Sequence, residues 1–168
     1  MKHKRIVIAG YAGIGKTTLA KKYSNVIDLE SSSFKYYEEK HHNFSEQVKG
    51  SKNRMLNKEY PYNFFAALEG AILNYNFVLI ARYPVFLDYL ELRNIDYWMV
   101  YPDKNSLSEY KKRFIKRGNT KEYIEKVIIN YDQELEALKK YKGHRVILKG
   151  NETLESYLLK SGYKLDKK

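Results

Sequence analysis

The sequence contains no cysteine, which excludes several kinds of site before any residue pattern is considered. A disulfide scaffold, a cysteine-ligated zinc site, an iron–sulfur cluster and a cysteine nucleophile all require thiols. No uncharged apolar run approaches the roughly 20 residues that a membrane span needs. With three prolines and nine glycines, the chain has no linker rich in either residue. We therefore expect residues 1–168 to form a single domain in the cytoplasm, without membrane contact.

The chain is strongly basic, with 31 Lys and Arg residues against 20 Asp and Glu and a formal net charge of +11. Hydrophobic residues make up 43% and charged residues 30%, which is typical of globular chains and not of disordered ones. A positive field favours anionic ligands such as nucleotides, phosphorylated metabolites or nucleic acid. The same excess also fits a solvated, lysine-rich surface, so charge alone does not decide between these interpretations.

Short apolar runs alternate with amphipathic segments along the chain. The first run follows basic residues, as in a signal peptide, but Lys16 interrupts the apolar stretch and no cleavage site follows. Strands are expected at residues 4–9, 25–29, 77–81, 95–101 and 145–148. Helices are expected at residues 16–23, 60–75, 84–94, 105–117 and 120–141, and in a short last helix capped by Asn151. Gly118 is expected to end the helix at 105–117, and Thr120 to cap the start of the helix that follows. This alternation predicts an α/β fold with a parallel sheet covered on both faces.

Residues Gly10–Thr17 match the phosphate-binding pattern G-x-x-x-x-G-K-[ST], with an expected strand before it and an expected helix after it. Glycines allow a tight turn that brings backbone N–H groups close to phosphate oxygens, and the helix start adds further N–H groups. Lys16 is expected to neutralise the outer phosphates, Thr17 to bind Mg²⁺, and Thr18 to add polar lining. The expected nucleotide-binding residues are Gly10, Ala12, Gly13, Ile14, Gly15, Lys16, Thr17 and Thr18.

Other phosphate-binding classes fit the sequence less well. Gly13-Ile14-Gly15 begins like a dinucleotide fingerprint, but its third glycine position is Thr18 and that interpretation leaves Lys16 unused. A GTPase needs D-x-x-G, which is absent, and N-K-x-D, where this chain has Asn57-Lys58-Glu59-Tyr60. A motor or AAA-type ATPase needs an acidic pair after a core strand, where this chain has Ile80-Ala81-Arg82.

On these grounds the chain resembles the small P-loop kinases of the nucleoside and nucleotide kinase-like group. The resemblance covers the whole chain in layout, and only the phosphate loop is highly specific. It implies a three-layer P-loop kinase fold with a five-stranded parallel sheet, order 2-3-1-4-5, and a basic helical lid at residues 104–121. More loosely, Val-Ile-Asp-Leu-Glu-Ser-Ser, Tyr-Pro-Asp and Arg-Gly-Asn resemble segments of ATP-binding proteins, without an assigned substrate, from Gram-positive bacteria and their phages.

In the kinase group, an acid at the end of the second strand activates the acceptor hydroxyl or holds Mg²⁺. Asp28 and Glu30 occupy that place, on one face and about 6–7 Å apart if the strand stays extended. The resemblance assigns catalysis or metal binding to Asp28 and substrate binding to Glu30, and which of the two is the catalytic acid stays open. A turn or cap role is the structural alternative for both.

The resemblance also assigns roles to three arginines. Arg113 and Arg117 are four residues apart, share a helix face and are expected to clamp the transferring phosphate, with Gly118 as hinge. Arg82 is expected to bind the acceptor, although the acid that usually accompanies it is missing. A solvated basic helix and a rim arginine are the structural alternatives.

Residues 31–75 are expected to form the acceptor side, because their polar part, 31–58, is a long insertion for a compact domain. The inward side chains of the helix that follows are expected to be Phe65, Leu68 and Ile72. His41 and His42 lack spaced partners, so metal binding there is not expected. Tyr36 and Tyr37 either stack on a base or pack on the surface.

The sequence therefore predicts an ATP- and Mg²⁺-dependent phosphotransferase acting on a nucleoside, nucleotide or similar small acceptor. One alternative is a 5′-hydroxyl polynucleotide kinase that binds single-stranded nucleic acid, which the positive charge suits. Another is a non-catalytic ATP-binding regulatory or phage accessory protein, which the missing strand-end acid favours. The sequence does not identify the acceptor, the preference for ATP or GTP, or the oligomeric state.

Overall fold

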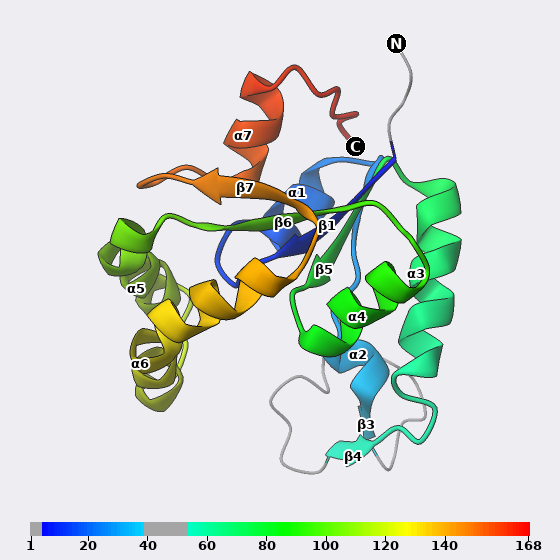
Figure 1. The fold of residues 1–168 in the computed structure, drawn as a ribbon, viewed down its shortest axis with the longest axis horizontal. Coiled ribbons are helices and arrows are strands. Elements are labelled where there is room, and N and C mark those ends of the chain that lie inside the picture. Colours follow the sequence, from blue (N-terminus) through cyan, green and yellow to red (C-terminus); the bar gives the residue numbers. More distant parts are fainter. Residues whose placement is uncertain (1–4, 39–53) are drawn as a thin grey trace.

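The computed structural model describes residues 5–38 and 54–168. Five strands form one all-parallel sheet, and each lies within two residues of its predicted position. They are β1 (Ile6–Gly10), β2 (Val26–Asp28), β5 (Phe77–Ala81), β6 (Tyr97–Pro102) and β7 (His144–Leu148). Their order across the sheet is β2-β5-β1-β6-β7, or 2-3-1-4-5 when these strands are numbered along the chain (Figure 1).

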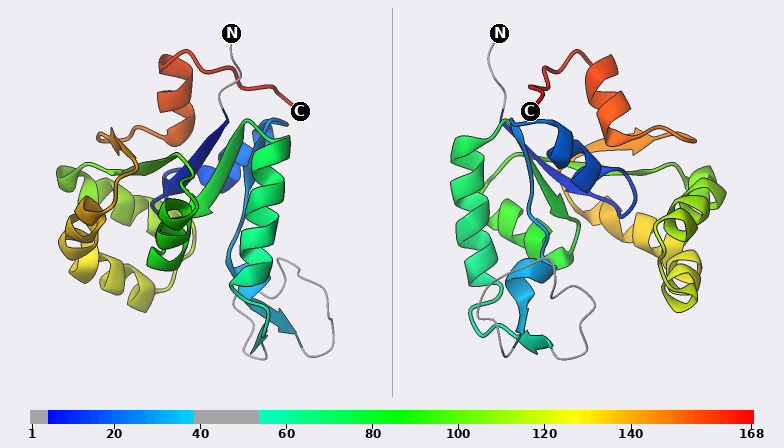
Figure 2. Two further views of the ribbon diagram at one scale, coloured as in Figure 1. Left: turned by 45° about the vertical axis from the view of Figure 1, so that its right-hand side comes forward. Right: turned by 180° about the vertical axis from the view of Figure 1, so that it is seen from behind.

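Both faces of the sheet are covered by helices (Figure 2), as the apolar strands require. Ile6 and Ile8 belong to one core with side chains of α1, α5, α6 and α7, whereas Val7 and Ala9 face α3 and α4. The helices are α1 (Lys16–Lys22), α2 (Ser32–Lys35), α3 (Tyr62–Asn74), α4 (Pro84–Leu92), α5 (Leu107–Lys116), α6 (Lys121–Ala137) and α7 (Leu154–Lys160). This arrangement is compatible with a three-layer α/β fold, so the predicted fold class is confirmed at that level.

Two of the predicted helix ends agree with the structure, and one does not. The Thr120 side chain accepts a hydrogen bond from the N–H of Tyr123 and begins α6, as predicted. Gly118 has φ of 73° after α5, which confirms it as the terminating glycine. The prediction that Asn151 caps the last helix is wrong, because Thr153 caps it and shares a capping box with Ser156.

The polar insertion at residues 31–58 contains short regular elements among its described residues. Helix α2 leads into β3 (Tyr36–Glu38), which pairs antiparallel with β4 (Arg54–Leu56). These two strands were not predicted from the sequence, because three residues are too few to show an alternating pattern and all three residues of β4 are exposed. His41 and His42 lie outside the described residues.

The buried face of α3 differs from the predicted one. Its buried side chains are Phe64, Leu68 and Ala71, whereas Phe65 and Ile72 are only partly buried. The prediction was wrong by one position for two of three residues, because a broad apolar stripe lets several helix rotations satisfy the same spacing. None of the helices in residues 5–38 and 54–168 has both the length and the apolar composition needed to cross a lipid bilayer.

Candidate functional site

The loop from Gly10 to Thr17 joins β1 to α1 at the edge where the parallel strands end (Figure 1). Its sharp turns depend on Gly13, with φ of 83°, and Gly15, with φ of 100°. A Cβ on Gly13 would also lie 3.3 Å from the rings of Tyr110 and Phe114, so α5 packs directly against the loop. The glycine pattern therefore serves both the turn and close packing.

The Lys16 side chain folds back across this loop. Its Nζ donates hydrogen bonds to the carbonyl oxygens of Gly10, at 3.0 Å, and Tyr11, at 3.1 Å. Gly10 is the last residue of β1 and Tyr11 is the first residue of the turn, so these hydrogen bonds hold the ammonium group where the loop begins. This position suits a cation that neutralises a bound anion.

Burial within the loop lowers the pKa of Lys16 to about 8. The carboxylates of Asp28 and Glu30 oppose this effect, and the guanidinium groups of Arg117 and Arg82 add to it. These four residues come from β2, the segment after it, the end of α5 and the end of β5. The fold therefore gathers five sequence-predicted site residues into one electrostatic environment.

Thr17 and Asp28 are directly joined. The Thr17 hydroxyl donates to Oδ2 of Asp28 at 2.8 Å, because β2 ends beside the start of α1. Glu30 lies just beyond and accepts a hydrogen bond from the Ser32 hydroxyl at 3.2 Å. A hydroxyl and a carboxylate oxygen are hard ligands of the type Mg²⁺ prefers, and Mg²⁺ commonly takes one or two protein ligands with substrate phosphates and water.

No group of three or more His, Asp or Glu side chains that could hold a metal comes together within residues 5–38 and 54–168.

Arg82, directly after β5, is held by two contacts. Its Nη2 pairs with Oε2 of Glu134 from α6, and its guanidinium stacks on the Tyr11 ring at 4.2 Å. The Arg82 side chain is 20% exposed. Glu134 was missed by sequence reasoning, since nothing in a long polar helix marks the carboxylate that pairs with Arg82.

The two predicted lid arginines occupy different surroundings although they are one turn apart. Arg113 donates to the carbonyls of Gly13 and Glu152, at 3.1 and 3.3 Å, and lies 3.5 Å from the carboxylate of Glu109. Arg117 is exposed and its charge acts on Lys16. Arg117 is therefore the more accessible of the two for contact with a bound anion.

The remaining loop residues complete the turn. Ile14 is fully buried, and its carbonyl accepts a hydrogen bond from the N–H of Leu154 at 2.9 Å. Ala12 is partly buried against the core, and Thr18 is exposed beside Thr17. The side chain of Ile14 thus anchors the loop in the core.

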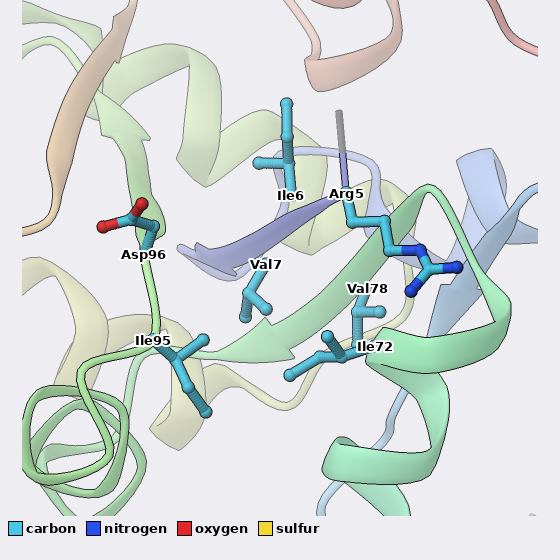
Figure 3. A pocket seen from close by; sticks show the side chains of 7 residues that line it. All are labelled: Arg5, Ile6, Val7, Ile72, Val78, Ile95 and Asp96. Carbon is cyan, nitrogen blue, oxygen red and sulfur yellow. The ribbon is translucent and has the colours of Figure 1, made fainter. Parts of the chain in front are cut away.

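A separate pocket lies at the other end of the sheet (Figure 3). It is lined by Arg5, Ile6, Val7, Ile72, Val78, Ile95 and Asp96. These residues lie at or before the starts of β1, β5 and β6 or on α3, whereas the Gly10–Thr17 loop follows the end of β1. The pocket is mostly apolar and contains none of the predicted site residues.

Comparison of the chain with protein-family models gave no match, and comparison with curated proteins gave none either.

Proposed function

We propose that the chain is an ATP- and Mg²⁺-dependent phosphotransferase of the P-loop kinase type, acting on a nucleoside, nucleotide or similar small acceptor. The observation that carries this proposal is the contact between Thr17 and Asp28 beside the ammonium group of Lys16. An ammonium group, a hydroxyl and a carboxylate at the carboxyl edge of a parallel sheet are parts that phosphoryl transfer uses.

The roles of the side chains follow from their positions. Lys16 would neutralise the outer phosphates, and the Thr17 hydroxyl, alone or with Asp28, would hold Mg²⁺, which would supply further positive charge to the bound nucleotide. The acceptor oxygen forms a bond to the terminal phosphorus, the bond to the ADP oxygen breaks, and the acceptor proton passes to Asp28 or Glu30. Arg117 stabilises the charge that develops on the transferring group.

Arg82 is proposed to meet an anionic or polar group of the acceptor. Its Nη2 is engaged by Glu134, its guanidinium lies over the Tyr11 ring, and its Nε is buried without a hydrogen-bond partner among the described residues. An acceptor that binds there would either replace Glu134 as the partner of Arg82 or bind Arg82 together with Glu134. The proposed acceptor site would therefore contain a cation, Arg82, although the end of β5 carries no acidic residue.

The second candidate is a nucleotide-binding regulator without catalysis. It is favoured by the end of β5, where Ile80-Ala81-Arg82 carries no acid and Arg82 is already paired with Glu134. A regulator would bind ATP without any effect of an acceptor on turnover.

ADP release with a panel of acceptors separates the two candidates. The panel contains nucleosides, nucleoside monophosphates, small metabolites with hydroxyl groups and 5′-hydroxyl oligonucleotides, with the Lys16→Ala variant as control. A kinase shows ADP release that depends on one class of acceptor and is lost in the variant. Tight ATP binding with no acceptor effect supports the regulator, and no ATP binding by the parent chain refutes both.

A further inference from the structure

A single guanidinium group joins three segments of the chain behind the loop. Arg113 projects from α5, and its Nη1 and Nη2 donate to carbonyls of Gly13 in the loop and Glu152 in the turn before α7. Its side chain is 16% exposed and its charge is balanced by Glu109 one turn earlier. Both hydrogen bonds are to backbone oxygens, so the guanidinium binds the backbone of the loop and of the turn before α7.

The held carbonyls determine where the neighbouring N–H groups point. In a planar trans peptide the C=O and the N–H of one unit point in opposite directions. Arg113 holds the Gly13 carbonyl, and the N–H of Leu154 holds the Ile14 carbonyl. The N–H groups of Ile14 and Gly15 belong to these same two units and therefore point away from Arg113 and Leu154.

These N–H groups are suited to an anionic ligand. Within the described parts of the chain, neither the N–H of Ile14 nor that of Gly15 donates a hydrogen bond to another group. Successive backbone N–H groups that converge in a turn form a concave anion site. Their alignment depends on the carbonyls on the opposite side being held in place.

We infer that Arg113 is a positioning residue, which fixes the Gly13 peptide so that the Ile14 and Gly15 N–H groups are aligned for a phosphate before the nucleotide arrives. This inference rests on the proposed function, because it concerns the same loop. Arg113 would then lie on the side of the loop opposite the phosphates, and Arg117 on the same side as the phosphates. Preorganised donors are valuable because the binding step then spends no free energy on ordering them.

The packing of α5 supports this assignment. Tyr110 and Phe114 lie against Gly13, and the Arg113 guanidinium stacks on the Tyr110 ring at 4.6 Å. The ring restricts the guanidinium plane, and the two carbonyls fix its direction. A lysine at this position would keep the charge but would present one ammonium centre in place of a fork that reaches both carbonyls.

The substitution Arg113→Lys separates geometry from charge. Affinity for MgATP is measured by calorimetry in the parent chain, Arg113→Lys, Arg113→Ala and a matched control, Arg145→Lys. Arg145 also donates to a backbone carbonyl, that of Lys139 at 2.6 Å, but from β7 and not toward the loop. Thermal unfolding of each variant establishes that it is folded.

The expected result is MgATP affinity reduced roughly tenfold in Arg113→Lys, the scale of one lost charge-assisted hydrogen bond, with parental affinity in Arg145→Lys. Amide ¹H–¹⁵N spectra of the ligand-free proteins are expected to show displaced or broadened Ile14 and Gly15 resonances in Arg113→Lys only. A merely structural role would lower the unfolding temperature without this local change.

Parental affinity and parental Ile14 and Gly15 resonances in Arg113→Lys would overturn the inference while leaving the proposed function intact. Full recovery of affinity by lysine after loss in Arg113→Ala would show that charge and not position matters, which also overturns it. If the parent chain binds no MgATP, the proposed function fails and this inference fails with it. The two failures are therefore distinguishable in one set of titrations.

Discussion

The lowered pKa of Lys16 makes nucleotide binding depend on pH in a direction that can be calculated. With a pKa of about 8, caused mainly by burial and modified by Asp28, Glu30, Arg117 and Arg82, Lys16 loses its charge as the pH rises through 8. The uncharged fraction is about 10% at pH 7, half at pH 8 and about 90% at pH 9.

ATP phosphates favour the charged form of Lys16, so binding should raise its pKa and draw a proton from solution. About half a proton per ATP is expected at pH 8 and about 0.9 at pH 9 if the pKa in the complex exceeds 10. Affinity should accordingly be highest below pH 8 and about tenfold lower at pH 9 than at pH 7. The sign is fixed: a group that must be protonated to bind loses affinity above its free pKa.

Calorimetric titration of MgATP in two buffers of different ionisation enthalpy measures this proton uptake directly. The Lys16→Ala variant serves as control, because it removes the titrating group and should show neither the uptake nor the decline. Equal affinity of the parent chain at pH 7 and pH 9, with no proton uptake at pH 8, would refute the placement of Lys16 against the phosphates.

Three further predictions test other parts of the site. Asp28→Asn should reduce phosphoryl transfer by roughly two to four orders of magnitude with ATP binding retained, in single-turnover assays, and a larger loss in Glu30→Gln would reverse their assigned roles. Glu134→Gln should release Arg82 and change the KM for the acceptor more than the KM for ATP; equal changes in both would argue against an acceptor role. Single-stranded oligonucleotides should bind weakly and without dependence on length, measured by fluorescence anisotropy; steep weakening with salt would instead favour the polynucleotide kinase.

The central strands β1, β5 and β6 were predictable from the sequence because they are buried on both faces and so appear as continuous apolar runs, of which Phe77–Ala81 is the clearest. The loop was predictable because tight turns with positive φ demand glycine at Gly13 and Gly15. The contact between Thr17 and Asp28 followed from parallel topology, which places strand ends and loop at one edge.

Other features depend on tertiary packing that no local pattern records. The pairing of Arg82 with Glu134 joins residues 52 positions apart and depends on where α6 crosses the sheet edge. Arg113 and Arg117 look equivalent in sequence, yet the packing of α5 directs Arg113 to the loop carbonyls. Helical spacing alone could not distinguish these two surroundings.

Transfer of the terminal phosphate of ATP to an acceptor tests the central claim most directly. ATP labelled in that phosphate is incubated with Mg²⁺ and the acceptor that stimulates ADP release most, and the label is located by chromatography. The account predicts label on the acceptor with the parent chain and none with the folded Lys16→Ala variant. Label that stays on ATP or appears only as free phosphate, or equal transfer by the variant, would contradict it.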